Sequence, residues 1–466
     1  MLTRTANEDS LFDFWPRVRE FAVPASMIET ATARRRAGDW AGACAAARFD
    51  IDLNIRAVAR AYGGELTARL RADLRHLAPD LLRWHLPRIA PDGLLRPGLT
   101  IALARYDTPG RNGPGPVHLV VRTPPAWAAA GQRISLALWD GTHSGSAACG
   151  GHPHPHPNRR FRLDLHRHLW DTRRTGELPG RSGADRADDA EPAVPAQELT
   201  AMLPDGCDVA LDRWADEAAI LLRAEGRRRT GTVLVRPGAG RLVLDLVPGD
   251  GDGPPALRSA PAFTGGATSA LPVLPDAATW VLPDLRLLRS GAIPVERLHP
   301  LVASALVPDC SPTGPPALRD RTGRPRLVEC RGARHRIALV DGVLAPLDHD
   351  PAEIRREELL VALTGTPLPC LRVIDEAHRH PDCLTGVRER LDHGDITGAL
   401  AVVEGLLGPD ALLRDGALRD ALERAARGRV AHGLFRAGLV GSGRDRFPPA
   451  PRDSRHRSAP PRLARV

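Results

Sequence analysis

The chain has 466 residues and a formal net charge of +8, and all 64 of its basic residues are arginines. The chain contains no lysine. The phosphate-binding P-loop, the protein kinase site and the pyridoxal imine each use a lysine amine, so their usual forms are excluded. The 44 glycines and 44 prolines indicate folded blocks separated by loose segments, in a length that accommodates roughly two to four domains.

A helical N-terminal block is predicted over residues 1–95. Ser26 and Glu29 have the spacing of a capping box, Gly38 can end the first helix, and Asp39 can cap the next. An apolar stripe at helical spacing consists of Leu66, Leu70, Leu74 and Leu77.

An antiparallel β module is predicted over residues 96–174. Short runs with a period of two are bounded by Gly, Pro and Asp, and they read LTIALARY, PVHLVVR and RISLALW. The run FRLDLH, residues 161–166, gives a fourth expected strand.

The centre of the chain alternates between poorly apolar and strand-forming segments. Residues 175–200 predict a disordered linker, and residues 201–247 predict a helix followed by a β-hairpin. Residues 248–275 form a Gly/Pro-rich linker, and residues 276–345 a mixed segment with short strands at RLVEC and HRIALV.

A helical C-terminal block is predicted over residues 346–440. It opens with Asp350 as N-cap, Pro351 in the first turn and Glu353 three residues after the cap. Its apolar stripe consists of Ile396, Ala399, Leu400, Val403, Leu406 and Leu407. Residues 441–466 predict a disordered basic tail. The whole is an α+β protein, with αα-hairpins at both ends around central antiparallel β-rich modules.

The two helical ends share one local pattern. Gly38–Ala45 reads GDWAGACA and Gly394–Ala401 reads GDITGALA, so both match G-D-x-x-G-A-x-A. The pattern resembles the helix-turn-helix step of tetratricopeptide-type hairpins over roughly 30 residues at each end. Because 356 positions separate the copies, it indicates two separate hairpins and no tandem solenoid. Such hairpins either serve the fold alone or form a groove for a partner.

Residues 371–382, LRVIDEAHRHPD, match three unrelated short motifs. Asp375–His378 is similar to the DEAH box of helicases, His378–Asp382 to the metal motif of metallo-β-lactamase-like hydrolases, and His380–Asp382 to the J-domain loop. The first motif works with a P-loop lysine, the second needs a longer fold after it, and the third follows a helix with a basic face. The first two contexts are absent, and the third is present only in part, because Arg372, Asp375, Glu376 and Arg379 make the preceding helix charge-balanced. We therefore interpret the stretch as helix punctuation, in which Pro381 ends one helix and the aspartate after it caps the next.

Cys149–Asp171 concentrates five histidines beside a cysteine, and both residue types bind zinc. Its alternating His-Pro part is expected to be extended like polyproline, so that the imidazoles splay apart. On a strand, Asp164, His166 and His168 project from one face and can supply three ligands to Zn²⁺ or Mn²⁺. The other interpretation of the same pattern is a solvated strand face whose acid pairs with the flanking arginines.

These observations lead to two hypotheses of function. The first is a non-catalytic protein-binding or scaffold component, without a cofactor, whose partner is another protein; no coherent acid/base pair or acyl-transfer serine stands out. The alternative is a metal-dependent hydrolase or nuclease with Zn or Mn at Asp164, His166 and His168.

The cellular setting follows from composition. Seven scattered cysteines without a C-x-x-C pair indicate reduced thiols, and no apolar signal segment or run of about 18 apolar residues is present, so we expect a cytoplasmic protein that does not enter a membrane. Abundant Arg, Ala, Gly and Pro are typical of GC-rich bacteria such as actinobacteria. Aromatic residues make up only 4% and the body is near neutral, so sequence-specific nucleic-acid binding is not expected.

Overall fold

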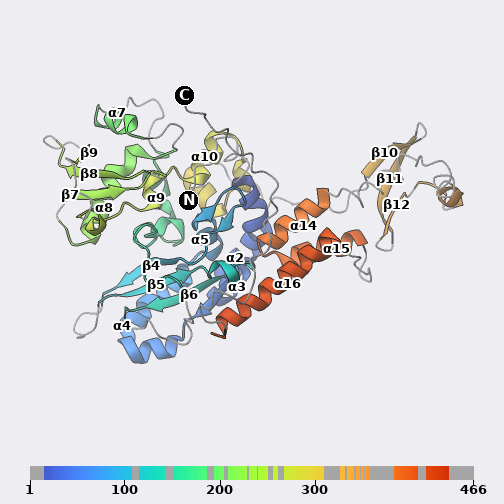
Figure 1. Cartoon of the computed structure of the whole chain (residues 1–466), viewed down its shortest axis with the longest axis horizontal. Helices are drawn as coiled ribbons and strands as arrows, with labels where there is room; N and C mark the ends of the chain where they lie inside the picture. Colours follow the sequence, from blue (N-terminus) through green and yellow to red (C-terminus); the bar gives the residue numbers. More distant parts are fainter. Residues whose placement is uncertain are drawn as a thin grey trace, which may run out of the picture.

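The structure is a computed structural model. It describes residues 15–107, 115–141, 152–185, 194–203, 208–227, 230–238, 240–249, 255–260, 267–308, 326–330, 333–340, 343–346, 348–350, 352–356, 382–407 and 416–439. Helices and antiparallel strands occur in separate parts of the chain, which confirms the α+β class (Figure 1).

The helical elements occur at both ends and between the sheets. The α-helices are α2 (Ala25–Arg36), α3 (Trp40–Ala46), α4 (Ile55–His76), α5 (Pro79–His85), α6 (Leu178–Ser182), α7 (Val194–Ala201), α8 (Trp214–Ala224), α9 (Asp276–Thr279), α10 (Pro283–Arg289), α11 (Pro300–Leu306), α14 (Asp382–Asp392), α15 (Ile396–Leu407) and α16 (Ala417–Arg436). Shorter turns are the π-helix η1 (Val18–Ala22) and the 3-10 helices η2 (Ala126–Ala128), η4 (Arg167–Leu169), η5 (Thr175–Glu177), η6 (Leu211–Arg213), η7 (Ala267–Ala270) and η8 (Val295–Arg297).

The strands of the described residues form four small sheets. They are β1 (Phe49–Asp52), β2 (Arg88–Ile89), β3 (Leu94–Leu95), β4 (Thr100–Tyr106), β5 (Val117–Arg122), β6 (Ile134–Trp139), β7 (Gly231–Val235), β8 (Leu242–Val247), β9 (Ala256–Ser259), β10 (Arg326–Cys330), β11 (Ala333–Val340) and β12 (Val343–Pro346). The sheet orders are β1-β6-β5-β4, β2-β3, β7-β8-β9 and β10-β11-β12, and every pair is antiparallel except β1 with β6.

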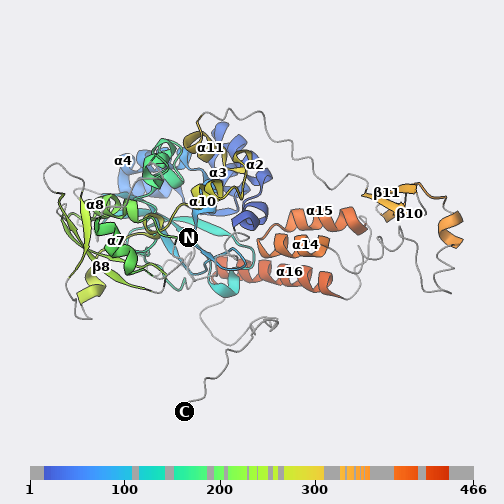
Figure 2. The same ribbon diagram turned by 90° about the horizontal axis from the view of Figure 1, so that it is seen from above.

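Among the described residues, the three largest apolar cores define three parts of the molecule. The body consists of the sheet β1-β6-β5-β4 with α2–α5, α10 and α11, which share the largest core. The second unit consists of α8 packed on β7-β8-β9. The C-terminal block consists of α14, α15 and α16, which lie side by side and project from the body, with β10–β12 at their far end (Figures 1 and 2).

The predicted N-terminal helices are present, with one correction at their start. Gly38 is left-handed (φ +78°) after α2, and Asp39 accepts a 2.8 Å hydrogen bond from the Gly42 amide as the N-cap of α3. The capping box at Ser26 is wrong, because α2 begins at Ala25 and its N-cap position is occupied by proline. The predicted leucine stripe is buried in the core of the body.

The predicted strands of the β module are confirmed for β4, β5 and β6, which form an antiparallel meander. The sequence did not predict β1, which interrupts the helical block and pairs in parallel with β6. Its residues alternate between apolar and acidic, so a strand buries one side only, and the neighbouring helical pattern masked this short run.

Two predicted linkers contain regular structure. The disordered linker over residues 175–200 is wrong where η5, α6 and α7 form, because Leu178 of α6 is buried in the core of the body. The loose linker over residues 248–275 is wrong at β9, because Leu257 is buried against α8 in the second unit. The predicted helix and hairpin of that unit, α8 with β7 and β8, are present.

The later segments follow the prediction in part. The strands expected at RLVEC and HRIALV are β10 and β11, whereas residues 276–306 form helices that the mixed-segment prediction did not include. Asp350 accepts a 2.9 Å hydrogen bond from the Ala352 amide, as expected of an N-cap. The predicted stripe of α15 buries Ala399 and Val403, but Leu400 is exposed. The predicted tail, residues 441–466, lies outside the described residues.

No helix in the described part of the chain combines the length and the apolar character needed to cross a membrane. Cys44 is a free, buried thiol in α3, and burial raises its pKa to about 12. This thiol is therefore unreactive at neutral pH.

Candidate functional site

The predicted metal residues lie in a buried turn of the body. Residues 161–169 pass through successive turns into η4, so the fourth strand expected there is wrong. Leu165 is partly exposed whereas the neighbouring His166 is buried, which is the reverse of the alternation that the predicted strand requires. Asp164 faces its neighbour Arg162, whose guanidinium donates two hydrogen bonds of 2.8 Å to the carboxylate.

His166 and His168 are 1% and 3% exposed and lie beside Glu217. Nε2 of His166 lies 3.1 Å from Glu217 Oε2, and Nδ1 lies 2.9 Å from the carbonyl oxygen of Arg162. Arg181 donates hydrogen bonds of 2.6 and 2.8 Å to the same carboxylate. Burial opposes ionisation of Glu217, but His166 and Arg181 outweigh it and hold its pKa well below the ordinary value. Burial, then His166, lowers the pKa of His168 well below the ordinary value, so this ring is neutral.

The geometry gives this cluster a structural role. Glu217 lies on α8 in the second unit, whereas Arg181 lies on α6, whose neighbouring Leu178 belongs to the core of the body. The ion pairs therefore join the two units. Asp164 takes no part in the cluster. Among the described residues no group of three or more His, Cys, Asp or Glu side chains could hold a metal ion, so the expected Zn or Mn site finds no ligand set there.

The sheet of the body has a polar face at its β1 end. The two apolar residues of β1 pack toward the core, and Asp50 and Asp52 alternate onto the opposite face. Strand register places Ser135 of β6 beside Asp50, and Arg122 of β5 beside Ser135. Carboxylate, hydroxyl and guanidinium groups thus form one row across three strands.

The C-terminal end of α16 covers this polar face. Nε2 of His432 lies 3.1 Å from Asp50 Oδ2, and Arg436 donates to both carboxylate oxygens of Asp52, in one case at 2.5 Å. Arg133 also donates to Asp50, with Nη2 2.5 Å from Oδ1. Burial opposes ionisation of Asp50, but the hydrogen bonds from His432 and Arg133 outweigh it and hold the pKa of this carboxyl well below its usual range.

The turn between α14 and α15 contacts the body at a second place. Arg48 adopts a left-handed conformation (φ +63°) between α3 and β1, which is uncommon for a residue with a side chain. Its Nη1 donates a 2.5 Å hydrogen bond to the His393 carbonyl oxygen, and its Nη2 lies 3.2 Å from Asp395 Oδ1. Arg17 pairs with Glu389 on the same side of α14. Backbone strain at Arg48 thus coincides with the contact to the C-terminal block.

His393 is buried where this turn meets η1. Its ring stacks on Phe21 with a centroid distance of 6.4 Å and an interplanar angle of 8°. Burial, followed by the positive charges of Arg88 and Arg83, lowers the pKa of His393 to about 3. The docked block therefore holds a neutral imidazole against the body at neutral pH.

The two G-D-x-x-G-A-x-A copies have the same capping geometry. Each aspartate accepts a hydrogen bond from the amide of the second glycine, at 2.8 Å from Gly42 to Asp39 and at 3.3 Å from Gly398 to Asp395. Each also binds the arginine five positions earlier, at 3.1 and 2.9 Å. The sequence prediction of two αα-hairpins is confirmed, and the arginine extends the shared pattern.

The surroundings of the two turns differ. A Cβ atom on Gly38 would meet open space, whereas a Cβ atom on Gly394 would overlap the carbonyl oxygen of Gly131. Both glycines are left-handed, with φ of +78° and +80°. The first turn is therefore exposed, and the second is the one that docks on the body.

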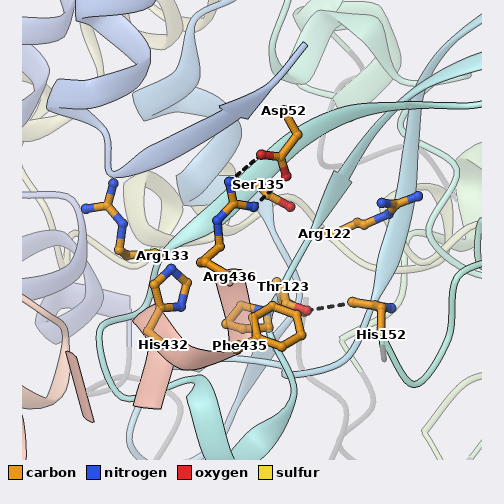
Figure 3. A pocket seen from close by; sticks show the side chains of 10 residues that line it. Asp52, Arg122, Thr123, Arg133, Ser135, His152, His432, Phe435 and Arg436 are labelled. Carbon is orange, nitrogen blue, oxygen red and sulfur yellow. Dashed lines mark hydrogen bonds and ion pairs between the residues drawn. The ribbon is translucent and has the colours of Figure 1, made fainter. Parts of the chain in front are cut away.

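A hollow lies where α16 meets the polar face (Figure 3). The space between its lining side chains is about 350 Å³, open solvent included. Its lining comes from β1, β5, β6 and α16, from the loop after β5, from the residue before β6 and from position 152. The lining residues are Asp52, Arg122, Thr123, Pro124, Arg133, Ser135, His152, His432, Phe435 and Arg436. His152 is the one residue of the predicted His-Pro stretch that reaches this hollow, whereas His156 packs on Trp139. These two imidazoles therefore contact different residues.

Sequence reasoning missed this interface. It identified Asp39 and Asp395, but not the contacts of Asp50 and Asp52 with α16. The alternation of β1 and the spacing of four between His432 and Arg436 on α16 were available signals. The motif stretch 371–382 lies outside the described residues, except that α14 begins at its last position.

Comparisons with protein-family models, with curated proteins and with solved structures find no match for this chain. Its function is therefore inferred from the contacts of the chain itself.

Proposed function

We propose that the protein is a non-catalytic protein-binding or scaffold component of a bacterial cytoplasm, and that the C-terminal block docks its partner. The observation that carries the proposal is the polar attachment of this block. The block contacts the sheet edge through ion pairs and hydrogen bonds made by Arg48, His432 and Arg436, beside ring contacts of Phe435 with Trp127 and of His393 with Phe21.

The block does not depend on the body for an apolar core. Its own core contains Val387, Leu391, Ala399, Val403 and Ala421. In the part of the chain that the structure describes, none of the buried residues of the body's core comes from α14, α15 or α16. Separation of the block would therefore leave each core with all of its own residues.

The ion pairs that attach the C-terminal block to the body are weak enough for a partner to replace them. The docking ion pairs are partly exposed, with side-chain exposures of 30% for Arg436 and 17% for Asp52. Such pairs contribute on the order of 0–1 kcal/mol each, and interfaces of this kind within a chain resemble transient protein–protein interfaces. A partner helix that presents cationic side chains one turn apart can replace α16 on the polar face.

Charge reversal tests the proposal. Arg436→Glu and Asp52→Arg each break the pair, whereas the double variant Arg436→Glu/Asp52→Arg restores it with the charges exchanged. If the docked block covers the partner's surface, affinity capture from the native host should recover more of one partner with each single variant. Recovery should return toward the wild-type level with the double variant. Arg427→Glu, at an exposed position of α16, is the matched control for the added negative charge.

Two results would contradict this function. One is that the wild type and all four variants recover the same proteins in the same amounts as an empty affinity matrix. The other is metal-dependent hydrolysis by the purified chain that His166→Ala with His168→Ala abolishes, together with about one equivalent of bound zinc or manganese, which would favour the enzyme alternative.

A further inference from the structure

The C-terminal block meets the body at two contacts whose charges have opposite sign. At the contact with α14 the body supplies the cation, because Arg17 pairs with Glu389 of the block. At the contact with α16 the body supplies the anion, because Asp52 pairs with Arg436 of the block. A block that docks the other way round would bring like charges together at both contacts. The charges therefore select one orientation of one particular surface.

Two glycines of the block add a requirement of shape. A Cβ atom on Gly394 would overlap the carbonyl oxygen of Gly131, and a Cβ atom on Gly428 would overlap Ala130. Gly428 lies inside α16, where glycine is unfavourable for the helix itself, so its small size serves the contact with the body. A foreign helix would need the same charges and the same two small residues, whereas the C-terminal block of a second copy has them by identity.

The connection between the body and the block is long. Residues 307–381 separate α11 from α14, and among them β10, β11 and β12 are only 5, 8 and 4 residues long. These strands lie at the far end of the block (Figure 1). An extended chain spans up to about 3.3 Å per residue, so a connection of this length lets the block reach the body of an adjacent copy. The block also moves with its own core, which consists of residues from α14, α15 and α16.

We propose that the body of one copy binds the C-terminal block of a second copy, so that two chains exchange their blocks and form a dimer. The inference rests on the proposed function, because it names a second copy of the chain as the partner. An exchanged block makes the same contacts as a block docked on its own body, so exchange requires no new interface. The connection favours the closed chain in dilute solution. The dimer gains as the protein concentration approaches the effective concentration of the tethered block, on the order of 1 mM.

Complementary variants of the purified full-length protein test the exchange. Asp52→Arg changes the body and Arg436→Glu changes the block, so each protein alone brings like charges together at the α16 contact. In an equimolar mixture, each body can bind the block of the other protein with opposite charges. After transient exposure to about 1 M salt, the mixture at roughly 100 μM should contain at least about ten times more dimer than either protein alone. Native mass spectrometry with one protein isotopically labelled identifies this dimer as the heterodimer.

The other contact provides an independent pair of variants. Arg17→Glu changes the body and Glu389→Arg changes the block, so their mixture should also form an excess of heterodimer. This pair keeps the test decisive if Asp52→Arg fails to fold. Arg427→Glu is the matched control for Arg436→Glu, because it places the same charge at an exposed position of α16. Its mixture with Asp52→Arg should form no excess of heterodimer.

A steric variant separates this contact from general attraction between charges. Gly428→Leu, added to both Asp52→Arg and Arg436→Glu, should remove the heterodimer, because the larger side chain overlaps Ala130. Heterodimer that persists with Gly428→Leu in both proteins, or no excess of heterodimer with either pair of charge variants, would overturn the exchange. Capture from the native host remains the separate test of the proposed function. A foreign partner captured there, without heterodimer from the purified variants, would remove this inference and leave the proposed function in place.

Discussion

Gly38 and Gly394 occupy the same position in two copies of one turn, but only Gly394 lies in contact with another part of the protein. Both adopt left-handed backbone conformations, which cost a residue with a Cβ atom roughly 1 kcal/mol or more. The space at Gly38 is open, whereas Gly394 approaches the backbone of Gly131 on the body. Substitution of these two glycines therefore distinguishes the free-energy cost of a left-handed backbone from the cost of lost contact between the C-terminal block and the body.

Gly38→Ala should lower the free energy of unfolding by about 1 kcal/mol, the cost of the backbone conformation alone. Gly394→Ala should add to this a loss of docking, because its methyl group cannot fit against Gly131. Urea unfolding measures the first effect, and hydrogen exchange of the amides of α14 and α16 measures the second. Equal exchange of these amides in the two variants would contradict the docked geometry of the second turn.

The buried cluster around Glu217 makes a second prediction at the scale of single residues. Glu217→Gln leaves the guanidinium of Arg181 without its counter-charge and removes the carboxylate beside His166, so it should destabilise the protein by about 3–5 kcal/mol. Glu225→Gln, at the end of the same helix, removes a more exposed pair with Arg162 and should cost less than about 1 kcal/mol. Chemical denaturation of both variants at pH 7 checks the difference.

The pH dependence of this pair has a definite sign. Because the pKa of Glu217 is lower in the folded protein, its stabilisation is present above the ordinary value of 4.5 and is lost as the pH falls below it. Glu217→Gln should therefore flatten the acid side of the stability profile. An unchanged slope below pH 4.5 in the variant would contradict the ionised pair.

At the scale of elements, local sequence patterns predicted a helix or strand correctly where one face of the element is buried. The leucines of α4 and the alternating runs of β4, β5 and β6 predicted their elements correctly, because period and burial agree there. Short elements with tertiary contacts were missed. β1 has four residues between helices, and α6 depends on burial of Leu178 in a core contributed by distant residues. The candidate site was missed for the same reason, because the contacts of α16 with β1 join residues more than 380 positions apart.

The interface between α14 and η1 should respond to pH through His393. Its pKa of about 3 in the docked state is below the ordinary value of 6.5, so the undocked state binds a proton first as the pH falls. Docking is therefore strongest above pH 6.5 and weakens as the pH falls toward 3, by up to about 2 kcal/mol at pH 5. The groups that face this ring are Arg17, Arg48, Arg83, Arg88 and Glu389.

His393→Phe should keep the stacking on Phe21 and remove the titration. Hydrogen exchange of α14 should therefore accelerate between pH 7 and pH 5 in the wild type, after correction for the intrinsic effect of pH, but not in the variant. The same corrected acceleration in both proteins would exclude His393 as the group responsible.

At the scale of the whole molecule, net charge was a poor guide to where charge acts. The chain carries +8, of which residues 441–466 supply +5, from seven arginines and two aspartates, so the remaining 440 residues sum to only +3. The structure nevertheless gathers arginines and carboxylates at the contact between the body and the C-terminal block. Near neutrality therefore reflects matched pairs at an interface, and the arrangement of those pairs cannot be obtained from a sum of charges.

The three cores imply that the molecule does not open as one unit. The cluster of Glu217 and His166 joins the body to the second unit through buried ion pairs, whereas the ion pairs that hold the C-terminal block are partly exposed and stand beside the buried contact of His393 with Phe21. Salt screens exposed pairs much more than buried ones. The block should therefore be the first part to separate as ionic strength rises.

Hydrogen exchange of the full-length protein at low salt and at about 1 M salt tests this separation most directly. The polar attachment predicts that high salt accelerates exchange in α16 and in β1, while β4, β5 and β6 keep their low-salt rates. Exchange of α16 and the central strands at a common rate, unaffected by salt, would show that the C-terminal block is an inseparable part of the body.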